Sequence, residues 1–93
     1  MLSHLLSFVS RNRADMERLS EEVVNRVRAV PPERLASYAR TPWIESVERG
    51  GVPYRVEVRV EVIPGVGRRA VAVRVRRGRF PWTTLTSYLP VNL

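Results

Sequence analysis

Apolar residues in the first third of the chain recur at intervals of three or four, the spacing that gathers side chains along one side of an α-helix. Asn12 interrupts this stripe, and its position three residues before Asp15 resembles a helix N-cap pair. The pattern therefore predicts one long amphipathic helix, or two helices joined near residues 10–12. The stripe consists of Leu2, Leu5, Val9, Met16, Leu19, Val23, Val27 and Val30.

Prolines mark the next boundaries along the chain. Pro31 and Pro32 end the first helical pattern, because a proline inside a helix removes a backbone hydrogen bond. Pro32 also suits the first turn of a new helix, so we expect a short helix over residues 33–40. Thr41 and Pro42 close this second helix.

After Pro42 the hydrophobic pattern changes to a period of two, which is typical of β-strands with one buried face. The valines Val56, Val58, Val60 and Val62 alternate with the charged residues Arg55, Glu57, Arg59 and Glu61. A turn at residues 64–67 allows Ile63 to pair with Arg68 across a hairpin. In that register three valine pairs share one apolar face: Val60 with Val71, Val58 with Val73, and Val56 with Val75.

The opposite face of this hairpin carries more arginines than acids. The register brings Glu57 against Arg74 and leaves Arg76 beside Arg55. Glutamates therefore neutralise only part of the arginine row. Cross-strand Arg/Glu pairs also stabilise a solvated sheet face, so the pattern by itself does not require a ligand.

Two further strands complete the expected sheet. Gly50 and Gly51 predict a tight turn between a strand at residues 43–49 and the valine strand. In the simplest two-residue register Glu45 falls on the apolar side, and a bulge at the glycines would change that register. The tail is rich in β-forming residues and predicts a fourth, edge strand at residues 83–89.

Together the elements predict one α+β domain over residues 1–93, helical over residues 1–40 and β-rich over residues 43–93. The N-terminal helix or helices and the short helix pack on a three- to four-stranded antiparallel β-meander, because the valine face otherwise has nothing to bury it. A chain of 93 residues can form one modest core and is too short for two.

The net charge of +7 lies entirely in the second part of the chain. Residues 1–33 carry five arginines and five acidic residues, whereas residues 34–93 carry eleven arginines and four glutamates. This asymmetry is typical of a domain with one anion-binding face. All 16 basic residues are arginine, which fits a GC-rich genome as well as it fits ligand binding. Scarce amide side chains and abundant Arg/Glu pairs also fit a thermophile-like protein.

Several kinds of chemistry lack the residues that they need. The chain has no cysteine, one histidine (His4) and one aspartate (Asp15), so no nucleophile triad or transition-metal cluster can form. Gly65 and Gly67 lack the third glycine and the lysine of phosphate-binding loops. We expect no enzyme activity, no metal and no cofactor. The surviving enzyme hypothesis is a small RNase in which arginines stabilise the phosphorane charge.

The N-terminal sequence bears on location. Residues 1–10 are apolar but lack the basic segment and the small-residue cleavage site of a secretory signal. No apolar run approaches the length that spans a bilayer. We therefore expect a soluble, cytoplasmic protein with no membrane association.

Arginines and aromatic residues crowd residues 68–82, which hold six arginines and no acid. Guanidinium groups beside aromatic rings suit phosphates and stacked bases. We predict a surface on the charged sheet face that binds single-stranded DNA or RNA. Its predicted residues are Arg55, Arg59, Arg74, Arg76, Arg77, Arg79, Phe80 and Trp82. Tyr88, Trp43 and Tyr54 are further stacking candidates, and the last two also suit the core.

The order of a helix and then a Val/Arg-rich antiparallel sheet with aromatic residues, in a short chain without cysteine, resembles the archaeal ThermoDBP-related single-stranded DNA-binding proteins. The resemblance covers most of the chain in architecture and composition. It implies a hydrophobic, base-accepting cleft rimmed by basic residues, often within an oligomer. The extended C-terminal zipper helix of the founding member has no counterpart after Leu89 and Pro90, so we do not expect that mode of dimerisation.

Protein interaction is a second class of function. The apolar stripe over residues 2–30 spans about four heptads and also suits pairing with a second copy, as a homodimer or higher oligomer, or with a partner helix. A small antitoxin, immunity or adaptor protein would share these features, and its basic face would meet an acidic partner. Salt dependence separates the two classes, because phosphate binding weakens steeply with salt.

Overall fold

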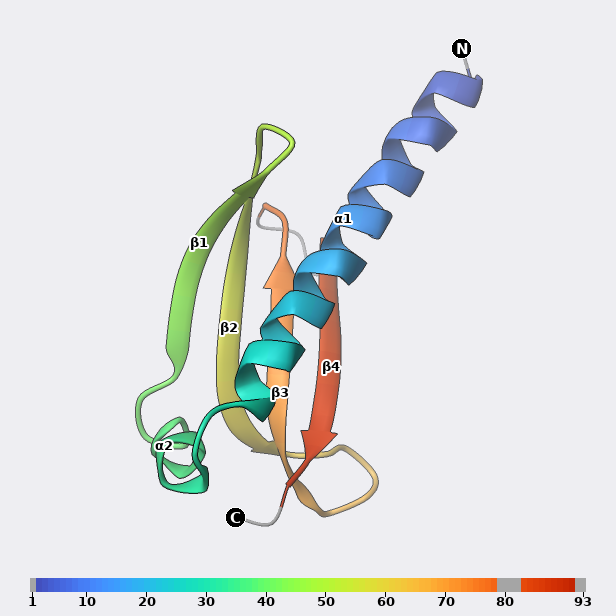
Figure 1. The fold of residues 1–93 in the computed structure, drawn as a ribbon. Helices are drawn as coiled ribbons and strands as arrows, with labels where there is room; N and C mark the ends of the chain where they lie inside the picture. The colour runs from blue at the N-terminus through green and yellow to red at the C-terminus, as the bar shows by residue number, and fades with distance from the viewer. Residues whose placement is uncertain (1, 79–82, 92–93) are drawn as a thin grey trace.

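The computed structural model describes the backbone of residues 2–78 and 83–91 and the side chains of residues 13–78 and 83–91. The elements are α1 (Leu2–Arg28), α2 (Pro32–Ser37), β1 (Trp43–Arg49), β2 (Val52–Val62), β3 (Arg69–Arg76) and β4 (Thr84–Pro90). The strands form an antiparallel meander in the spatial order β1-β2-β3-β4, and α1 crosses one face of it diagonally (Figure 1). This is the α+β architecture that the hydrophobic pattern predicts.

Helix α1 is continuous, so the alternative of two helices joined near residues 10–12 is wrong. One asparagine inside a helix costs at most about 0.7 kcal/mol relative to alanine, too little to break a helix of this length. The basic residues Arg26 and Arg28 in the last turn compensate the helix dipole. Within the described residues, neither helix combines the length and the hydropathy that a bilayer crossing needs.

The core lies between α1 and the valine face of the sheet. Leu19, Val23 and Val27 of α1 are at most 1% exposed, and α1 lies closest to β3 and β4. The strands contribute the fully buried valines Val56, Val58, Val71, Val73 and Val75. Leu35 of α2 joins the same cluster. Both helices therefore pack on one face, and no described helix covers the other.

Strand pairing confirms the predicted register of β2 and β3. The Cα partners are Val60 with Val71, Val58 with Val73, and Val56 with Val75. The Ile63 amide donates to the Arg68 carbonyl oxygen at 2.8 Å and closes the turn. Strand β4 pairs with β3 and lies one residue later along the chain than predicted.

The β1–β2 hairpin also follows the simplest predicted register, without a bulge. Gly50 and Gly51 form a two-residue turn with φ angles of 56° and 77°, which fits a type I′ turn. Glu45 is consequently the Cα partner of Val56 and faces the helix-covered side of the sheet. Its partner comes from α1, because Arg26 Nη2 lies 3.5 Å from Glu45 Oε2.

Helix α2 is shorter than the predicted span of residues 33–40 and ends at Ser37. The chain continues as tight turns, in which the Tyr38 amide donates to the Leu35 carbonyl oxygen at 3.1 Å. Hydrogen bonds of this i to i−3 type wind the chain more tightly than an α-helix does. The turns bring the ring of Tyr38 to 6.5 Å from the ring of Trp43, at the start of β1.

Leu19 tests how much the packing of α1 on the sheet contributes to stability. We expect Leu19→Ala to lower the free energy of unfolding by about 2–5 kcal/mol, because the change removes a buried side chain and leaves a cavity. The matched control is Val66→Ala, at a valine that is 64% exposed. This control should change stability by less than about 0.5 kcal/mol. Urea denaturation followed by circular dichroism measures both, and equal midpoints would contradict the packing.

Candidate nucleic-acid interface

The outer face is the sheet face that neither described helix covers. Strand alternation places on it Arg55, Glu57, Arg59, Glu61, Ala70, Ala72, Arg74, Arg76, Thr86 and Tyr88. The structure thus brings together four of the eight predicted binding residues, namely the four arginines in this set. Arg55 is exposed, whereas the other three arginines are partly buried.

Two of these arginines form ion pairs with glutamates. Arg59 Nε lies 2.6 Å from Glu57 Oε1 on the same strand. Arg74 donates to both carboxylate oxygens of Glu61, with 2.7 Å between Nη2 and Oε1. Glu57 is the cross-strand partner of Arg74, as predicted, but the guanidinium reaches diagonally to Glu61 instead. A bidentate pair of this kind is a strong, charge-assisted contact.

Two small residues of the outer face lie beside these charged residues. Ala70 and Ala72 are 0% exposed although no described helix lies over them. Their Cα partners on β2 are Glu61 and Arg59, and Tyr88 of β4 flanks Ala72 on the other side. Arg59 and Arg74 are therefore paired side chains beside two buried alanines and not part of a row of free cations.

The pair of Arg74 and Glu61 shifts the pKa values of both partners. The hydrogen bond from Arg74 holds the pKa of Glu61 below its ordinary value, and this effect outweighs the opposing effect of burial. The same hydrogen bond raises the pKa of Arg74. Each group is thus stabilised in its charged form by the other, which leaves Arg74 little free charge for a phosphate.

Arg55 and Arg76 keep their charge on the outer face. They are Cα partners, and neither contacts a carboxylate among the described residues. Arg76 Nε donates to the Gly78 carbonyl oxygen at 3.0 Å, which orients the guanidinium without neutralising it. Arg77 does not belong to this group of outer-face arginines. Its charge partly offsets the rise that burial causes in the pKa of the hydroxyl of Tyr54, which lies on the helix-covered side.

The aromatic residues divide between the two sides of the sheet. Tyr54 is 2% exposed, so its interpretation as a core residue is confirmed. Burial raises the pKa of its hydroxyl, and the charge of Asp15 raises it further. Tyr88 is half-buried on the outer face. The other predicted residues, Arg79, Phe80 and Trp82, lie outside the described residues.

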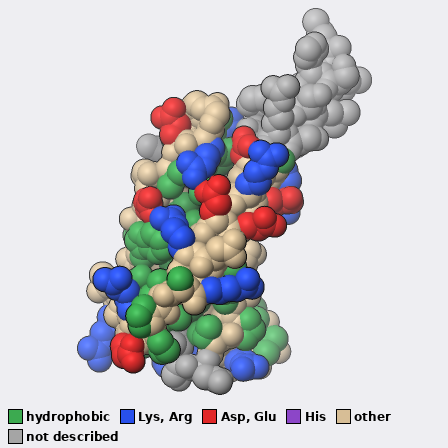
Figure 2. All heavy atoms as spheres, in the orientation of Figure 1, with side chains coloured by type: hydrophobic (Ala, Val, Ile, Leu, Met, Phe, Trp, Pro, Cys, Tyr) green, Lys and Arg blue, Asp and Glu red, His purple; other side chains and the backbone are tan. Residues whose placement is uncertain are grey.

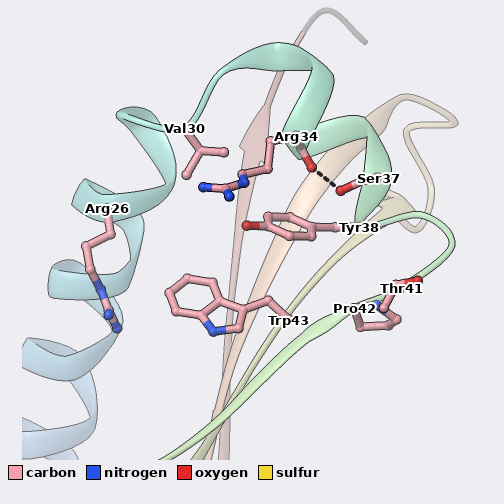
Figure 3. Close-up of a pocket in the computed structure, with 8 residues that line it drawn as sticks. All are labelled: Arg26, Val30, Arg34, Ser37, Tyr38, Thr41, Pro42 and Trp43. Carbon is pink, nitrogen blue, oxygen red and sulfur yellow. Dashed lines mark hydrogen bonds between the residues drawn. The ribbon is translucent and has the colours of Figure 1, made fainter.

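A cleft that the sequence pattern did not predict opens beside α2. Its volume is about 590 Å³, and it lies between the end of α1, α2 and the start of β1 (Figure 3). We call it the α2 cleft, lined by Arg26, Val30, Arg34, Ser37, Tyr38, Thr41, Pro42 and Trp43. Because α1 lies closest to β3 and β4, it leaves the first residues of β1 uncovered, and the cleft forms there.

Two aromatic rings and two guanidinium groups converge in the α2 cleft. The rings of Tyr38 and Trp43 meet at an interplanar angle of 32°. Arg26 Cζ lies 4.7 Å from the centroid of the Trp43 ring, which is a cation–π distance. Figure 3 shows the Arg34 guanidinium and the Tyr38 hydroxyl pointing into the same space. Arg34 has no carboxylate partner among the described residues.

The sequence pattern identified only Trp43 of this cleft as a candidate binding residue. Arg26, Arg34 and Tyr38 come from segments whose proximity depends on where α1 ends and how the chain turns into α2. The local signal was weak, consisting of two aromatic residues five positions apart on either side of Pro42. Such a spacing does not distinguish a cleft from a core contact.

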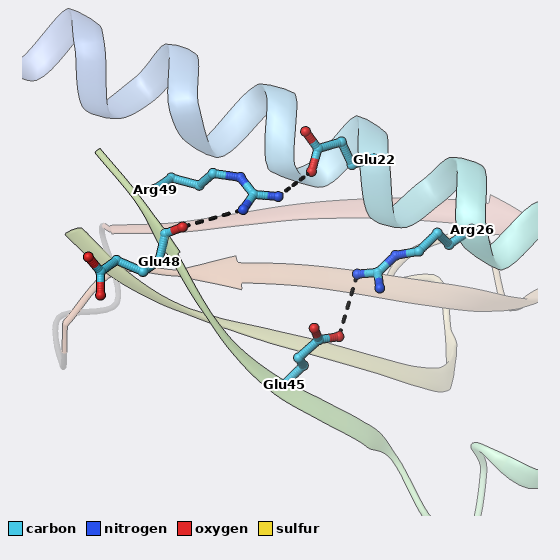
Figure 4. A network of polar contacts seen from close by, with 5 residues as sticks. All are labelled: Glu22, Arg26, Glu45, Glu48 and Arg49. Carbon is cyan, nitrogen blue, oxygen red and sulfur yellow. Dashed lines mark hydrogen bonds and ion pairs between the residues drawn. The ribbon is translucent and has the colours of Figure 1, made fainter. Parts of the chain in front are cut away.

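Ion pairs tie α1 to the edge strand β1 beside the cleft (Figure 4). Arg49 Nη2 donates to Glu22 Oε2 at 2.7 Å, and Arg26 Nη2 lies 3.5 Å from Glu45 Oε2. The four side chains are 38–54% exposed. Solvent screening therefore limits each pair to at most about 1 kcal/mol of stability. The pairs nevertheless neutralise the charges along this edge.

Free positive charge gathers at the end of the molecule that carries α2 and the β2–β3 turn. Figure 2 shows hydrophobic and basic side chains dominating the lower part of the helix-covered face, whereas acidic and basic side chains alternate above. The described arginines at this end, none with a carboxylate partner, are Arg28, Arg34, Arg40, Arg68 and Arg69. Glu33 is the one acidic residue within residues 28–40 and 63–69.

The lowered pKa of Glu61 predicts a specific dependence of stability on pH. A carboxyl group whose folded-state pKa is depressed contributes stability above its unfolded pKa and loses it as the pH falls through the folded value. We expect Glu61→Gln to cost about 1 kcal/mol at neutral pH and progressively less as the pH falls through the folded-state pKa.

Urea denaturation at several pH values measures this difference. The matched control is Glu48→Gln, at an exposed glutamate on β1 whose carboxylate forms no ion pair among the described residues. Its stability difference from the unsubstituted chain should stay small across the same range. A pH-independent effect of Glu61→Gln would contradict the ionic contribution of the pair.

The α2 cleft can stack a planar ring on its aromatic side chains and hold an anion with its guanidinium groups. Among the described residues, no group of three or more His, Cys, Asp or Glu side chains could hold a metal ion.

Searches against protein-family models, curated proteins and solved structures found no match to this chain, so the resemblance to the ThermoDBP-related proteins stays a prediction.

Proposed function

We propose that this protein binds single-stranded nucleic acid without catalysing a reaction, and that the α2 cleft receives a base of the strand. The proposal is carried by one observation: the rings of Tyr38 and Trp43 and the guanidinium of Arg34 converge in a cleft of about 590 Å³. A nucleotide presents a planar base next to a phosphate. It therefore needs an aromatic surface and a cation at neighbouring positions.

Two terms supply the affinity in this proposal. Stacking of one base on an aromatic side chain contributes about 1–3 kcal/mol. Phosphates on either side of the base meet the arginines at the same end of the molecule, such as Arg40 and Arg68, which have no carboxylate partner among the described residues. Each phosphate contact releases counterions, so the affinity should fall steeply with salt.

A single strand fits this surface better than a duplex. A base enters a cleft only when it is unstacked, which single strands allow readily. Binding in a major groove requires a basic helix surface. Among the described side chains, the exposed side of α1 instead mixes four arginines with the glutamates Glu17, Glu21 and Glu22, so its charge is nearly balanced.

The outer face has a smaller role in this proposal than the sequence predicts. Arg59 and Arg74 are paired with glutamates there. Arg55 and Arg76 have no carboxylate partner among the described residues, and in this proposal they attract the strand at long range without contacting its phosphates. Substitutions can therefore test the predicted sheet surface and the α2 cleft independently of each other.

An acidic protein surface is the second candidate partner. Val62 and Val66 are 56% and 64% exposed. They lie close in sequence to Arg68 and Arg69, which have no carboxylate partner among the described residues. Apolar and cationic groups side by side also suit a protein interface. Such a partner would be specific, whereas nucleic-acid binding through phosphates accepts many sequences.

Arg34→Glu tests the cleft as the binding site. We expect it to weaken the binding of labelled single-stranded oligonucleotides about tenfold and to lower the salt slope by about one phosphate contact, because it reverses a charge inside the cleft. Fluorescence anisotropy with single-stranded DNA, single-stranded RNA and duplex DNA at two salt concentrations measures this.

Two matched charge reversals serve as controls for this experiment. Arg18→Glu makes the same change on α1 outside the cleft, and Arg55→Glu makes it on the outer face. Both should weaken binding less than about threefold. If Arg55→Glu abolished binding and Arg34→Glu did not, the sheet surface predicted from the sequence would be the site. Binding to none of the three polymers would favour a protein partner.

Trp43 fluorescence tests stacking directly. The chain has two tryptophans, so Trp82→Phe leaves Trp43 as the single emitter. We expect an oligonucleotide to quench this emission, because a base stacked on the indole changes its surroundings. Tyr38→Ala in the same background should reduce both the quenching and the affinity. Unchanged emission at saturating oligonucleotide would contradict a base in the α2 cleft.

A further inference from the structure

Glu45 is an acidic residue in an unusual place. On β1 it lies on the helix-covered side, between Trp43 and Val47, and its Cα partner is the fully buried Val56. No other described strand residue on that side is acidic. Arg49 lies on the same side of β1 and pairs with Glu22 of α1, so both charged residues on this side of the strand have partners on the helix.

The partner of Glu45 is also a residue of the α2 cleft. Arg26 Nη2 lies 3.5 Å from Glu45 Oε2, and Arg26 Cζ lies 4.7 Å from the centroid of the Trp43 ring. One guanidinium group therefore rests between a carboxylate and the ring surface that a base would need. Arg26 lines both the α2 cleft and an adjoining groove of about 560 Å³ that Glu45 also lines.

The contact between Arg26 and Glu45 is suited to exchange. Their side chains are 50% and 38% exposed, and the pair has a single long contact and no bidentate geometry. An exposed pair of this kind is weak, so a phosphate oxygen can replace the carboxylate without unfolding the region. The partly buried, bidentate contact that Arg74 makes with Glu61 would resist such an exchange.

We propose that Glu45 controls access to the Trp43 ring. In the free protein Glu45 holds the Arg26 guanidinium over the Trp43 indole. When a strand binds, one of its phosphates replaces Glu45 as the partner of Arg26, and its base stacks on the indole. Glu45 is then a competitor of the phosphate, and it disfavours aromatic ligands that lack an anionic group. This inference rests on the proposed function of the α2 cleft.

Glu45→Gln should therefore tighten the binding of single-stranded oligonucleotide by about two- to fivefold, the range expected for release of an exposed ion pair. The salt slope should rise by about one, because Arg26 gains a phosphate contact. The matched control is Glu48→Gln, which removes the same charge from the same strand on the opposite face. Its effect should stay below about 1.5-fold.

A double-substitution cycle separates exchange at Arg26 from a general change of charge. If Glu45 acts through Arg26, then Glu45→Gln in an Arg26→Gln background should affect binding no more than Glu48→Gln does. An equal gain in both backgrounds would overturn the proposal. Circular dichroism of each variant verifies the fold.

The two proposals fail in different ways. If the unsubstituted chain binds oligonucleotide but Glu45→Gln and Glu48→Gln behave alike, the role of Glu45 is overturned and the proposed function stands. If the unsubstituted chain binds no oligonucleotide, both are overturned.

Discussion

Burial of one valine face beneath a single long helix is the constraint on which the rest of this structure depends. A helix with its side chains is about 10–12 Å wide, whereas the outer backbones of four strands at about 4.8 Å spacing lie about 14 Å apart. One helix therefore cannot cover the whole face. Helix α1 lies closest to β3 and β4, and the β1 side is left to Leu35 of α2, two ion pairs and the ring of Trp43.

The incomplete cover explains why the α2 cleft has its particular lining. The chain must turn from the end of α1 at Arg28 to the start of β1 at Trp43, and α2 fills only part of that path. Tyr38 and Trp43 face each other where the cover ends. Packing alone would favour closing this gap with apolar residues, so the guanidinium groups of Arg26 and Arg34 within it are the feature that most needs a functional explanation.

The outer face shows how the same arginines can serve stability. Without a described helix above them, Ala70 and Ala72 are still fully buried between the strands on either side, and the pair of Arg74 and Glu61 joins β3 to β2 in this part of the sheet. Counting arginines along a strand therefore overstates the charge available to a ligand. On the outer face only Arg55 and Arg76 have no carboxylate partner among the described residues, and five more such arginines lie at the end of the molecule that carries α2.

The sequence by itself determined the α+β class, the order of helices and strands and the β2–β3 register, because these follow from local periodicity and from the short turn at residues 64–67. It left open whether the first helix was continuous and whether a bulge at Gly50-Gly51 shifted the β1–β2 register. In the simplest register of that turn it also placed Glu45 on the apolar side, but it did not show which residue would pair with this carboxylate. Only the tertiary structure decided which charges pair: Arg74 with Glu61 instead of Glu57, and Glu45 with Arg26. The α2 cleft also depends on the tertiary structure. Its lining residues come from α1, α2 and β1, and their meeting depends on the diagonal path of α1 across the sheet, which no local pattern of residues specifies.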